Sequence, residues 1–233
     1  IYNPEPNKTF PYWGRIENPF HLKFMSDSTA YMKVRGWLRY KPLDISERDI
    51  KQFFKNSFQE INAKGVNNLI IDLRNNGGGS PRLATEMLRY LIPVTFIPIE
   101  YTQLKTQELT TISELRNTRN YRINKSSLKC ENKKLIVRHL GIYKKHRPRK
   151  SLFKGKVYFL VNAKCGSATS LFLALAEYHH IGKFVGETPG GNKEYVCGHQ
   201  LLTFELPNAQ LAAQIPLKKS KINTTNENSR DAV

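Results

Sequence analysis

The stretch NLIIDLRNNGGG, residues 68–79, joins a short, mostly apolar run to three consecutive glycines. The run from Leu69 to Leu73 is apolar at successive positions, as expected for a strand that is covered on both faces of a parallel sheet. The glycines remove every Cβ from the turn that follows, which permits positive φ and lets a ligand approach the backbone closely. We therefore expect a buried strand, a turn that offers bare N–H groups, and a helix with Pro81 in its first turn.

A second stretch, VYFLVNAKCGSATS at residues 157–170, has the same form: an apolar run, a turn of small residues and the start of an apolar helix. Ser167 stands between Gly166 and Ala168 at the helix start. A serine at this position is most often an N-cap. Small neighbours, the glycine turn of the first stretch and the positive potential of a helix N-terminus favour a nucleophile instead. Both interpretations stay open on this motif alone.

The alternation of strands and helices along the chain predicts an α/β core with parallel crossovers. Residues 46–49 have the pattern of a capping box, which opens a helix that Gly65 closes. The expected domain organisation is an irregular lead-in at 1–27, a core at 28–217 that includes a basic insertion at 103–156, and a polar tail at 218–233. The expected strands are 29–37, 69–73, 94–101, 157–161, 184–186, 200–204 and 210–215, and the expected helices follow Ser46, Pro81 and Ser167.

The net charge of +18 is concentrated in one segment of the 233-residue chain. Residues 116–156 contain fifteen Lys and Arg and one acidic residue, Glu131, so they carry +14 of the +18. Such a segment is either a solvated loop or a dock for an acidic partner. It lacks the regular aromatic residues of a single-strand nucleic-acid platform, so no nucleic acid is expected. The three cysteines, at 130, 165 and 197, lack the spacing of metal ligands and are expected to be free thiols.

Both stretches resemble segments of the C-terminal processing (tail-specific) serine peptidases. Residues 69–79 are similar to the family's IDLR-x-N-x-GG segment, and residues 157–170 are similar to its nucleophile segment. Gly186-Glu187, Gly190-Gly191 and residues 206–208 fit the same pattern in the same order. The resemblance covers most of residues 29–215. It implies a ClpP/crotonase-like core of stacked βαβ units with C-terminal β-hairpin elements and an active site at the strand ends.

The resemblance implies that Ser167 is the nucleophile, because it stands at the position of the family's catalytic serine. It implies an oxyanion hole formed by the backbone N–H groups of Ala168 and of Gly79 or Gly78. It implies neither a metal nor an organic cofactor. The implied substrate is a protein or peptide, and the implied location is periplasmic, cell-envelope or secreted. The oligomeric state stays open.

The general base is the part of the family pattern that this chain does not match. In the Ser–Lys branch, a lysine follows the second glycine loop, but Asn192 stands at that position and Lys193 comes one residue late. That branch also carries a glutamate where this chain has Ser170. A second branch, which resembles the tricorn core and retinoid-binding proteins, uses an upstream histidine and a C-terminal glutamate, to which Glu227 corresponds poorly. His199 is the best-placed internal histidine.

The sequence therefore predicts a serine endopeptidase of the C-terminal processing type and leaves open whether its general base lies inside or outside this chain. One alternative is a non-catalytic module that binds peptides or hydrophobic ligands on the same fold, as in the interphotoreceptor retinoid-binding protein. Another is an acyl-CoA enzyme of crotonase type, which also uses paired backbone amides. The Ser167 motif and the lack of an evident nucleotide-contacting signature argue against the acyl-CoA enzyme.

Overall fold

The computed structural model divides the chain into two compact units. Unit 1 comprises Ile1–Thr95 and His146–Gly191, and unit 2 comprises Phe96–Lys145 and Asn192–Val233. The structure describes residues 9–10, 14–15, 18–39, 44–104, 115–116, 128–131, 134–137, 144–198, 201–206, 208 and 211–224. No helix in this described part is long and apolar enough to cross a membrane.

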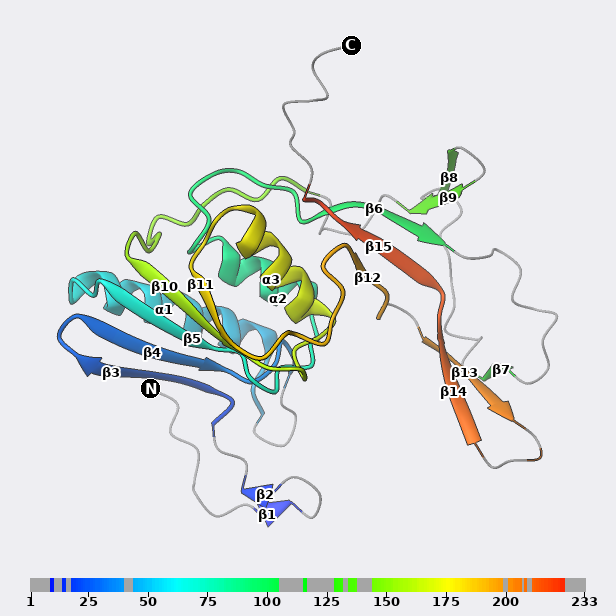
Figure 1. Cartoon of the computed structure of the whole chain (residues 1–233), viewed down its shortest axis with the longest axis horizontal. Helices are drawn as coiled ribbons and strands as arrows, with labels where there is room; N and C mark the ends of the chain where they lie inside the picture. The colour runs from blue at the N-terminus through cyan, green and yellow to red at the C-terminus, as the bar shows by residue number, and fades with distance from the viewer. Residues whose placement is uncertain are drawn as a thin grey trace, which may run out of the picture. The chain divides into compact units, whose positions relative to one another are not determined.

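Unit 1 is built on a five-stranded sheet with the order β11-β10-β5-β4-β3 (Figure 1). The four strands from β11 to β4 are parallel, and β3 pairs antiparallel with β4. The predicted α/β class is thus confirmed. The strands are β3 (Phe20–Ser26), β4 (Thr29–Val34), β5 (Asn68–Asp72), β10 (Lys156–Val161) and β11 (Lys183–Gly186), and a separate two-stranded ribbon joins β1 (Thr9–Phe10) to β2 (Gly14–Arg15).

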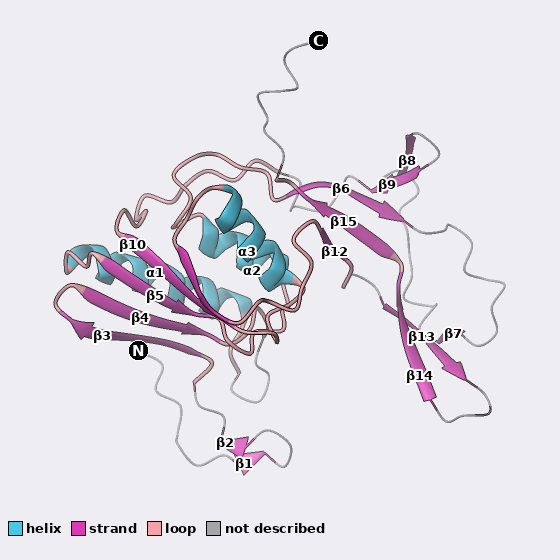
Figure 2. Ribbon diagram, in the orientation of Figure 1, coloured by secondary structure: helices cyan, strands magenta, loops and turns pink. Residues whose placement is uncertain are grey.

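Three helices follow successive parallel strands and cover one face of this sheet (Figure 2). Buried residues alternate along β4 and β10, so one face of each strand is enclosed and the other is partly exposed. Trp37 and Phe172 stack at 5.3 Å between ring centroids in the enclosed layer, and Phe159 packs edge-on against Phe172 at 5.5 Å. The helices are α1 (Glu47–Ala63), α2 (Pro81–Leu88) and α3 (Ala168–Tyr178).

The capping box predicted at Ser46 is present at the start of α1. Asp49 N–H donates to Ser46 Oγ at 3.3 Å, and Ser46 N–H donates to Asp49 Oδ2 at 2.8 Å. These bonds satisfy donors that have no partner inside a helix. The start of α1 is therefore determined locally by its sequence.

Two features of unit 1 differ from the sequence prediction. The lead-in that was expected to be irregular contains β3, because Phe20, Leu22 and Phe24 alternate toward α1 and pair with β4. The strand β5 was expected to be covered on both faces, yet within the described chain only one face is fully enclosed. Leu69 and Ile71 are buried there, whereas Ile70 is partly exposed.

Unit 1 also holds the last part of the basic segment, which packs on α2. The carboxylate of Glu86 is buried and accepts from Arg89 Nη1 at 2.9 Å and from Arg149 Nε at 2.7 Å. The backbone adds two bonds, from Arg149 N–H to Arg89 C=O at 2.7 Å and from Phe153 N–H to Tyr90 C=O at 2.8 Å. These contacts fix the return of the chain from the basic segment to β10.

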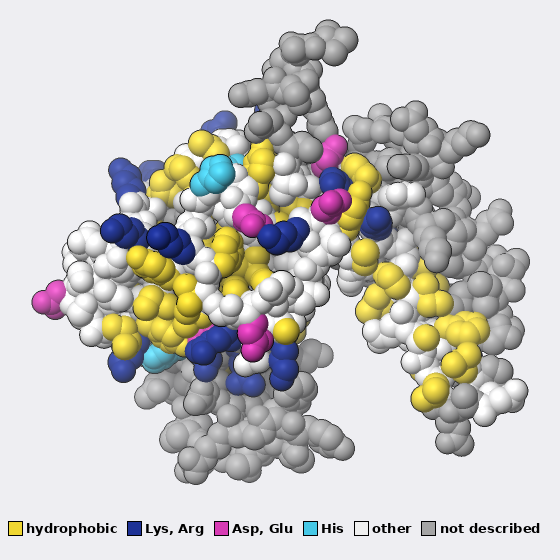
Figure 3. All heavy atoms as spheres, viewed as in Figure 1, with side chains coloured by type: hydrophobic (Ala, Val, Ile, Leu, Met, Phe, Trp, Pro, Cys, Tyr) yellow, Lys and Arg dark blue, Asp and Glu magenta, His cyan; other side chains and the backbone are white. Residues whose placement is uncertain are grey.

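Most of the basic segment 116–156 lies outside the described residues. Lys150, Lys154 and Lys156 are exposed in its described end. Figure 3 shows Lys and Arg side chains scattered over one face of the described chain, with apolar and single acidic side chains between them. The acidic partner expected at this segment therefore stays a prediction.

The described residues of unit 2 form antiparallel strands in two sheets. One has the order β12-β15-β6-β9-β8 and the other β14-β13-β7. Residues 218–222, predicted as the start of a polar tail, form β15, where Ser220 Oγ lies 2.6 Å from Thr102 Oγ1 in a buried pair. The strands are β6 (Ile99–Leu104), β7 (Leu115–Arg116), β8 (Leu128–Glu131), β9 (Lys134–Val137), β12 (Tyr195–Val196), β13 (Leu201–Leu206), β14 (Leu211–Pro216) and β15 (Lys218–Ile222).

Candidate active site

Parallel pairing of β5 with β10 brings the two predicted turns together at one edge of the sheet. Leu69 pairs with Val157 and Asp72 with Leu160, so both strands end side by side. Gly166 N–H donates across the gap to Asn76 C=O at 3.3 Å. A Cβ built on Gly78 would lie 2.6 Å from Ser167 Cβ, which is closer than real Cβ contacts. The glycine turn and the serine turn are thus in direct contact within unit 1.

Ser167 adopts a backbone conformation that non-glycine residues rarely adopt. Its φ is +55° and its ψ is −121°, a strained combination of the kind that costs about 1–3 kcal/mol. The residue is exposed, and its side chain makes no capping hydrogen bond to α3. The interpretation of Ser167 as an N-cap is therefore not supported. A serine on a strained strand-to-helix turn is instead typical of an exposed nucleophile.

Two backbone N–H groups near Ser167 have no acceptor in the part of the chain that the structure describes. Ala168 is the first residue of α3, where the N–H has no partner inside the helix. Gly78 C=O accepts a hydrogen bond from Trp37 N–H at 3.0 Å. Because the C=O of Gly78 and the N–H of Gly79 lie on opposite sides of a planar trans peptide, the Gly79 N–H points away from Trp37. Gly78 N–H, in contrast, donates to Asn76 Oδ1 at 3.1 Å. Of the two glycines considered, only Gly79 has an N–H without an acceptor among the described residues.

Asn76, which sequence reasoning did not single out, connects the two turns. Its buried side chain accepts from Gly78 N–H and from Thr169 Oγ1 at 2.8 Å, and it donates to Val34 C=O at 3.0 Å. Thr169 Oγ1 in turn accepts from Trp37 Nε1 at 2.9 Å. The available sequence signal was its place as the fixed asparagine of the IDLR-x-N-x-GG segment, but its partners Val34 and Thr169 are far away along the chain.

Further contacts fix the serine turn against the glycine loop at residues 186–191. Ala163 N–H donates to Glu187 Oε2 at 3.2 Å, and Gly191 N–H donates to Cys165 C=O at 3.1 Å. The buried Cys165 thiol donates to Leu73 C=O at 3.1 Å, and burial raises its pKa. Cys165 is therefore a packing residue, in agreement with the prediction of a free thiol.

A buried carboxylate anchors the start of the glycine turn. Arg74 Nε and Nη2 bind Asp72 at 2.9 and 2.8 Å, and Tyr31 Oη donates to Asp72 Oδ2 at 2.6 Å. Burial opposes ionisation of Asp72, but the hydrogen bonds from Arg74 and Tyr31 hold its pKa below the usual range. Burial and the bond to Asp72 raise the pKa of Tyr31 to about 12. This network holds the end of β5 rigid beneath the turn.

The described structure of unit 1 contains none of the three candidates for the general base. Lys193 belongs to unit 2 and is exposed, while His199 and Glu227 lie outside the described residues. Asn192 Oδ1 accepts from the N–H groups of Glu194 and Tyr195 at 2.7 and 2.9 Å, so it stabilises a turn before β12.

Ser170, where one branch of the family has a glutamate, is buried near Gly191. Its hydroxyl has no partner among the described residues. A Cβ on Gly191 would overlap it, so the loop and α3 pack closely here. All the described residues together contain no cluster of three or more His, Cys, Asp or Glu side chains that would hold a metal.

Gly78→Ala is expected to lower both the stability and any activity of this site, whereas Gly77→Ala is expected to change little. Gly78 has φ +114°, and its added Cβ would press on Ser167 and Ala168. Gly77 has open space around it and no positive φ. We expect Gly78→Ala to lose about 1–3 kcal/mol in urea unfolding. Equal stability of the two variants would contradict the close packing of the turns.

Comparison with known proteins agrees with this arrangement. The family model described as peptidase family S41 matches residues 28–228. The chain belongs to peptidase family S41. The family expected from the two motifs is thus confirmed, while the branch of S41 to which the chain belongs stays a prediction. No curated protein matches the chain in sequence.

Solved structures of other proteins share the fold. Mature CPAF in complex with lactacystin has a TM-score of 0.55 and 14% identity over 82% of this chain and 43% of its own. The photosystem II D1 C-terminal processing protease has a TM-score of 0.52 and 12% identity over 89% of this chain and 45% of its own. This S41 chain spans about half the length of these structures.

Proposed function

We propose that this S41 protein is a serine peptidase that cleaves peptide bonds through Ser167. The observation that carries the proposal is the environment of this residue. Its hydroxyl is exposed and makes no capping bond, and its strained turn contacts a glycine turn next to the amides of Gly79 and Ala168. Membership of S41 supports the same activity and also supports a periplasmic, cell-envelope or secreted location.

In the proposed mechanism, Ser167 Oγ attacks the carbonyl carbon of the scissile peptide bond. The carbonyl oxygen then gains negative charge, which the N–H groups of Gly79 and Ala168 stabilise. A base accepts the serine proton and passes it to the leaving amine, which departs as the C–N bond breaks. Water then hydrolyses the acyl-serine ester, releases the new carboxylate and restores the hydroxyl.

The two turns supply the nucleophile and the oxyanion hole but leave the base unassigned. Ser167 Oγ has no hydrogen-bond partner among the described residues. Asn76 and Asp72 act as positioning residues, because their side chains bond residues of the turns and none of these bonds involves Ser167. The base therefore comes from a residue other than these.

Lys193→Ala is expected to leave most of the peptidase activity. A Ser–Lys dyad needs a largely neutral lysine, which requires burial, and Lys193 is exposed beside the turn that Asn192 stabilises. We expect kcat/KM of the full-length protein to stay within about threefold of the wild-type value. A loss as large as that of Ser167→Ala, with unchanged circular dichroism, would identify Lys193 as the base.

The proposed activity is tested with an unfolded protein substrate, such as carboxymethylated casein. The full-length protein and its Ser167→Ala variant are incubated with the substrate, and the products are followed by intact-mass spectrometry. Fragments that form only with the wild-type protein support a Ser167-dependent endopeptidase. Fragments trimmed from the substrate's C-terminus support a C-terminal processing enzyme. No fragments with either protein would favour a non-catalytic binding module.

A further inference from the structure

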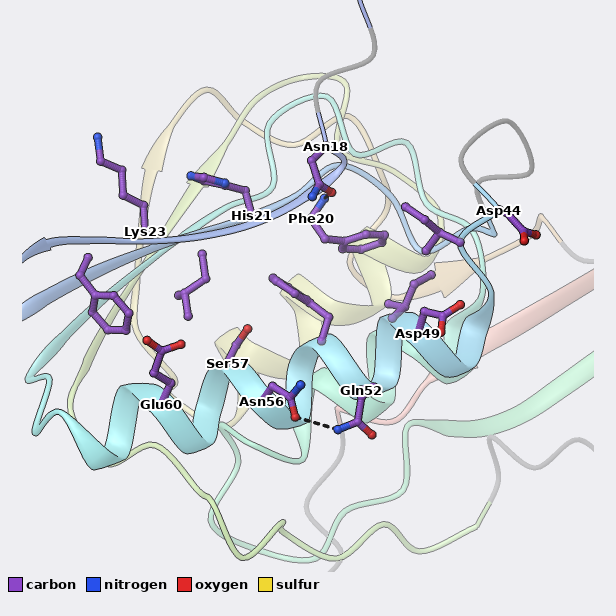
Figure 4. Close-up of a pocket in the computed structure, with 15 residues that line it drawn as sticks. Asn18, Phe20, His21, Lys23, Asp44, Asp49, Gln52, Asn56, Ser57 and Glu60 are labelled. Atoms are coloured by element: carbon purple, nitrogen blue, oxygen red, sulfur yellow. Dashed lines mark hydrogen bonds between the residues drawn. The ribbon is translucent and has the colours of Figure 1, made fainter. Parts of the chain in front are cut away.

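We infer that the groove between β3 and α1 binds an extended peptide segment in which apolar and acidic residues alternate. This groove is lined by both elements within unit 1 (Figure 4). It is separate from the Ser167 site, since β4 lies between β3 and the strand that carries the glycine turn. The inference does not depend on the proposed peptidase activity.

The backbone of β3 offers unused pairing groups at this groove. Among the described strands, only β4 pairs with β3, so β3 is an edge of the sheet. Arg35 N–H donates to Pro19 C=O, which makes Phe20 and Val34 a non-hydrogen-bonded pair of the antiparallel ladder. Because hydrogen-bonded and non-hydrogen-bonded pairs alternate, Leu22 and Phe24 direct N–H and C=O to the open edge. A segment added beside β3 can therefore form backbone hydrogen bonds at these two residues.

The side of β3 that faces α1 is apolar. Leu22, Phe24 and Phe53 are partly exposed along the groove, and Phe53 packs against Phe20 at 5.7 Å between ring centroids. Residues of an added strand that lie opposite Leu22 and Phe24 would project to this same side. Apolar side chains at those positions would cover the exposed rings.

The α1 side of the groove carries three carboxylates, those of Asp44, Asp49 and Glu60. Asp49 belongs to the capping box with Ser46, and Glu60 forms an ion pair with Lys64 at 2.9 Å. Gln52 Nε2 donates to Asn56 Oδ1 at 2.7 Å. Asp44 and Asp49 form no ion pair among the described residues, so this wall disfavours acidic side chains at the positions that face α1 and leaves those positions to apolar ones.

The opposite side of β3 is polar and carries one positive charge, that of Lys23. His21 and Lys23 are exposed and point away from α1 in Figure 4. Residues of an added strand that lie opposite them would project to the same face, where opposite charges attract and like charges repel. Acidic side chains therefore fit these positions, in alternation with the apolar ones.

The same charge argues against a second copy of this chain as the occupant. Two β3 strands paired antiparallel would bring the Lys23 side chains of both copies onto one face, and lysines on edge strands oppose such pairing. The other exposed edge of this sheet, β11, carries Lys183. A strand from another molecule, with alternating acidic and apolar residues, matches the edge of β3 better than a second copy of β3 does.

The experiment compares three fluorescein-labelled peptides by anisotropy: (Val-Glu)4, (Ser-Glu)4 and (Val-Lys)4. Measurements at about 0.15 M salt limit non-specific attraction to the basic chain. A Ser167→Ala background prevents cleavage of the peptides. We expect (Val-Glu)4 to bind at least tenfold more tightly than either other peptide. Equal binding of (Val-Glu)4 and (Ser-Glu)4, or no binding at millimolar protein, would overturn the inference.

Matched variants locate the binding. Lys23→Glu is expected to weaken (Val-Glu)4 binding about three- to tenfold, since it turns a cross-strand attraction into a repulsion. Lys183→Glu makes the same charge change on β11 and should alter binding less than twofold. Phe53→Ala should weaken binding without unfolding the protein, because this side chain is partly exposed. Equal effects of the two charge reversals, or full binding by Phe53→Ala, would overturn the assignment to this groove.

Discussion

Ser167→Ala is expected to reduce peptide hydrolysis by about a thousandfold or more while the protein keeps its fold and stability. The hydroxyl is exposed and makes no structural hydrogen bond in the described chain, so its removal should not affect folding. Alanine also retains the strain of the native turn, because both residues have a Cβ. The measurements are kcat/KM on an unfolded substrate and the urea midpoint. Activity within tenfold of wild type would exclude Ser167 from the mechanism.

Two control variants separate the chemical role of this residue from its backbone strain. Ser170→Ala removes a neighbouring serine hydroxyl that has no partner among the described residues, and we expect activity within a few-fold of wild type. Ser167→Gly should be as inactive as Ser167→Ala but more stable by about 1 kcal/mol, because glycine adopts φ near +55° without strain. Equal stability of Ser167→Gly and Ser167→Ala would contradict the strain.

Asn76→Ala is expected to have the largest effect on stability, a loss of about 3 kcal/mol or more in urea unfolding. The side chain is fully buried and bonds Gly78, Thr169 and Val34. Its removal leaves the Gly78 N–H, the Thr169 hydroxyl and the Val34 C=O without these partners. Each buried polar group that loses its partner costs about 1–3 kcal/mol. Activity should fall as well, because the same bonds hold the glycine turn against Ser167.

The matched control is Asn56→Ala, which replaces an exposed asparagine on α1. Asn56 bonds only Gln52 among the contacts described, and alanine favours a helix, so we expect a change within about 0.5 kcal/mol. If Asn76→Ala lost less than 1 kcal/mol, the bonds around Asn76 would not hold the two turns together.

The local parts of this fold were predictable from the sequence. The capping box at Ser46 and the small residues around Ser167 act through neighbours a few residues away, so their patterns are visible in a single stretch. The apolar runs at β5 and β10 and the intervening helices also predicted parallel strands. From that pairing it followed that the two turns would meet at one edge of the sheet.

The features that the sequence did not predict depend on contacts between distant residues. Asn76 and Thr169 are 93 positions apart, and the partners of Glu86 include Arg149 from the basic segment. The strand β3 lies in a stretch rich in Pro, Asn and aromatic residues, and it forms because it pairs with β4 and packs one face against α1. The choice between Gly78 and Gly79 required the hydrogen bond from Gly78 to Asn76. No periodicity or motif contains this information.

The central claim, that Ser167 is an activated nucleophile facing an oxyanion hole, is tested most directly by fluorophosphonate labelling. The full-length protein is treated with the probe, digested and mapped by mass spectrometry, with the Ser167→Ala variant as control. We predict a stoichiometric adduct on the peptide that contains Ser167 and no adduct in the variant. An absence of the Ser167 adduct would contradict the claim. If that preparation still hydrolysed peptides, the nucleophile would be another residue, and if it did not, the protein would be a binding module.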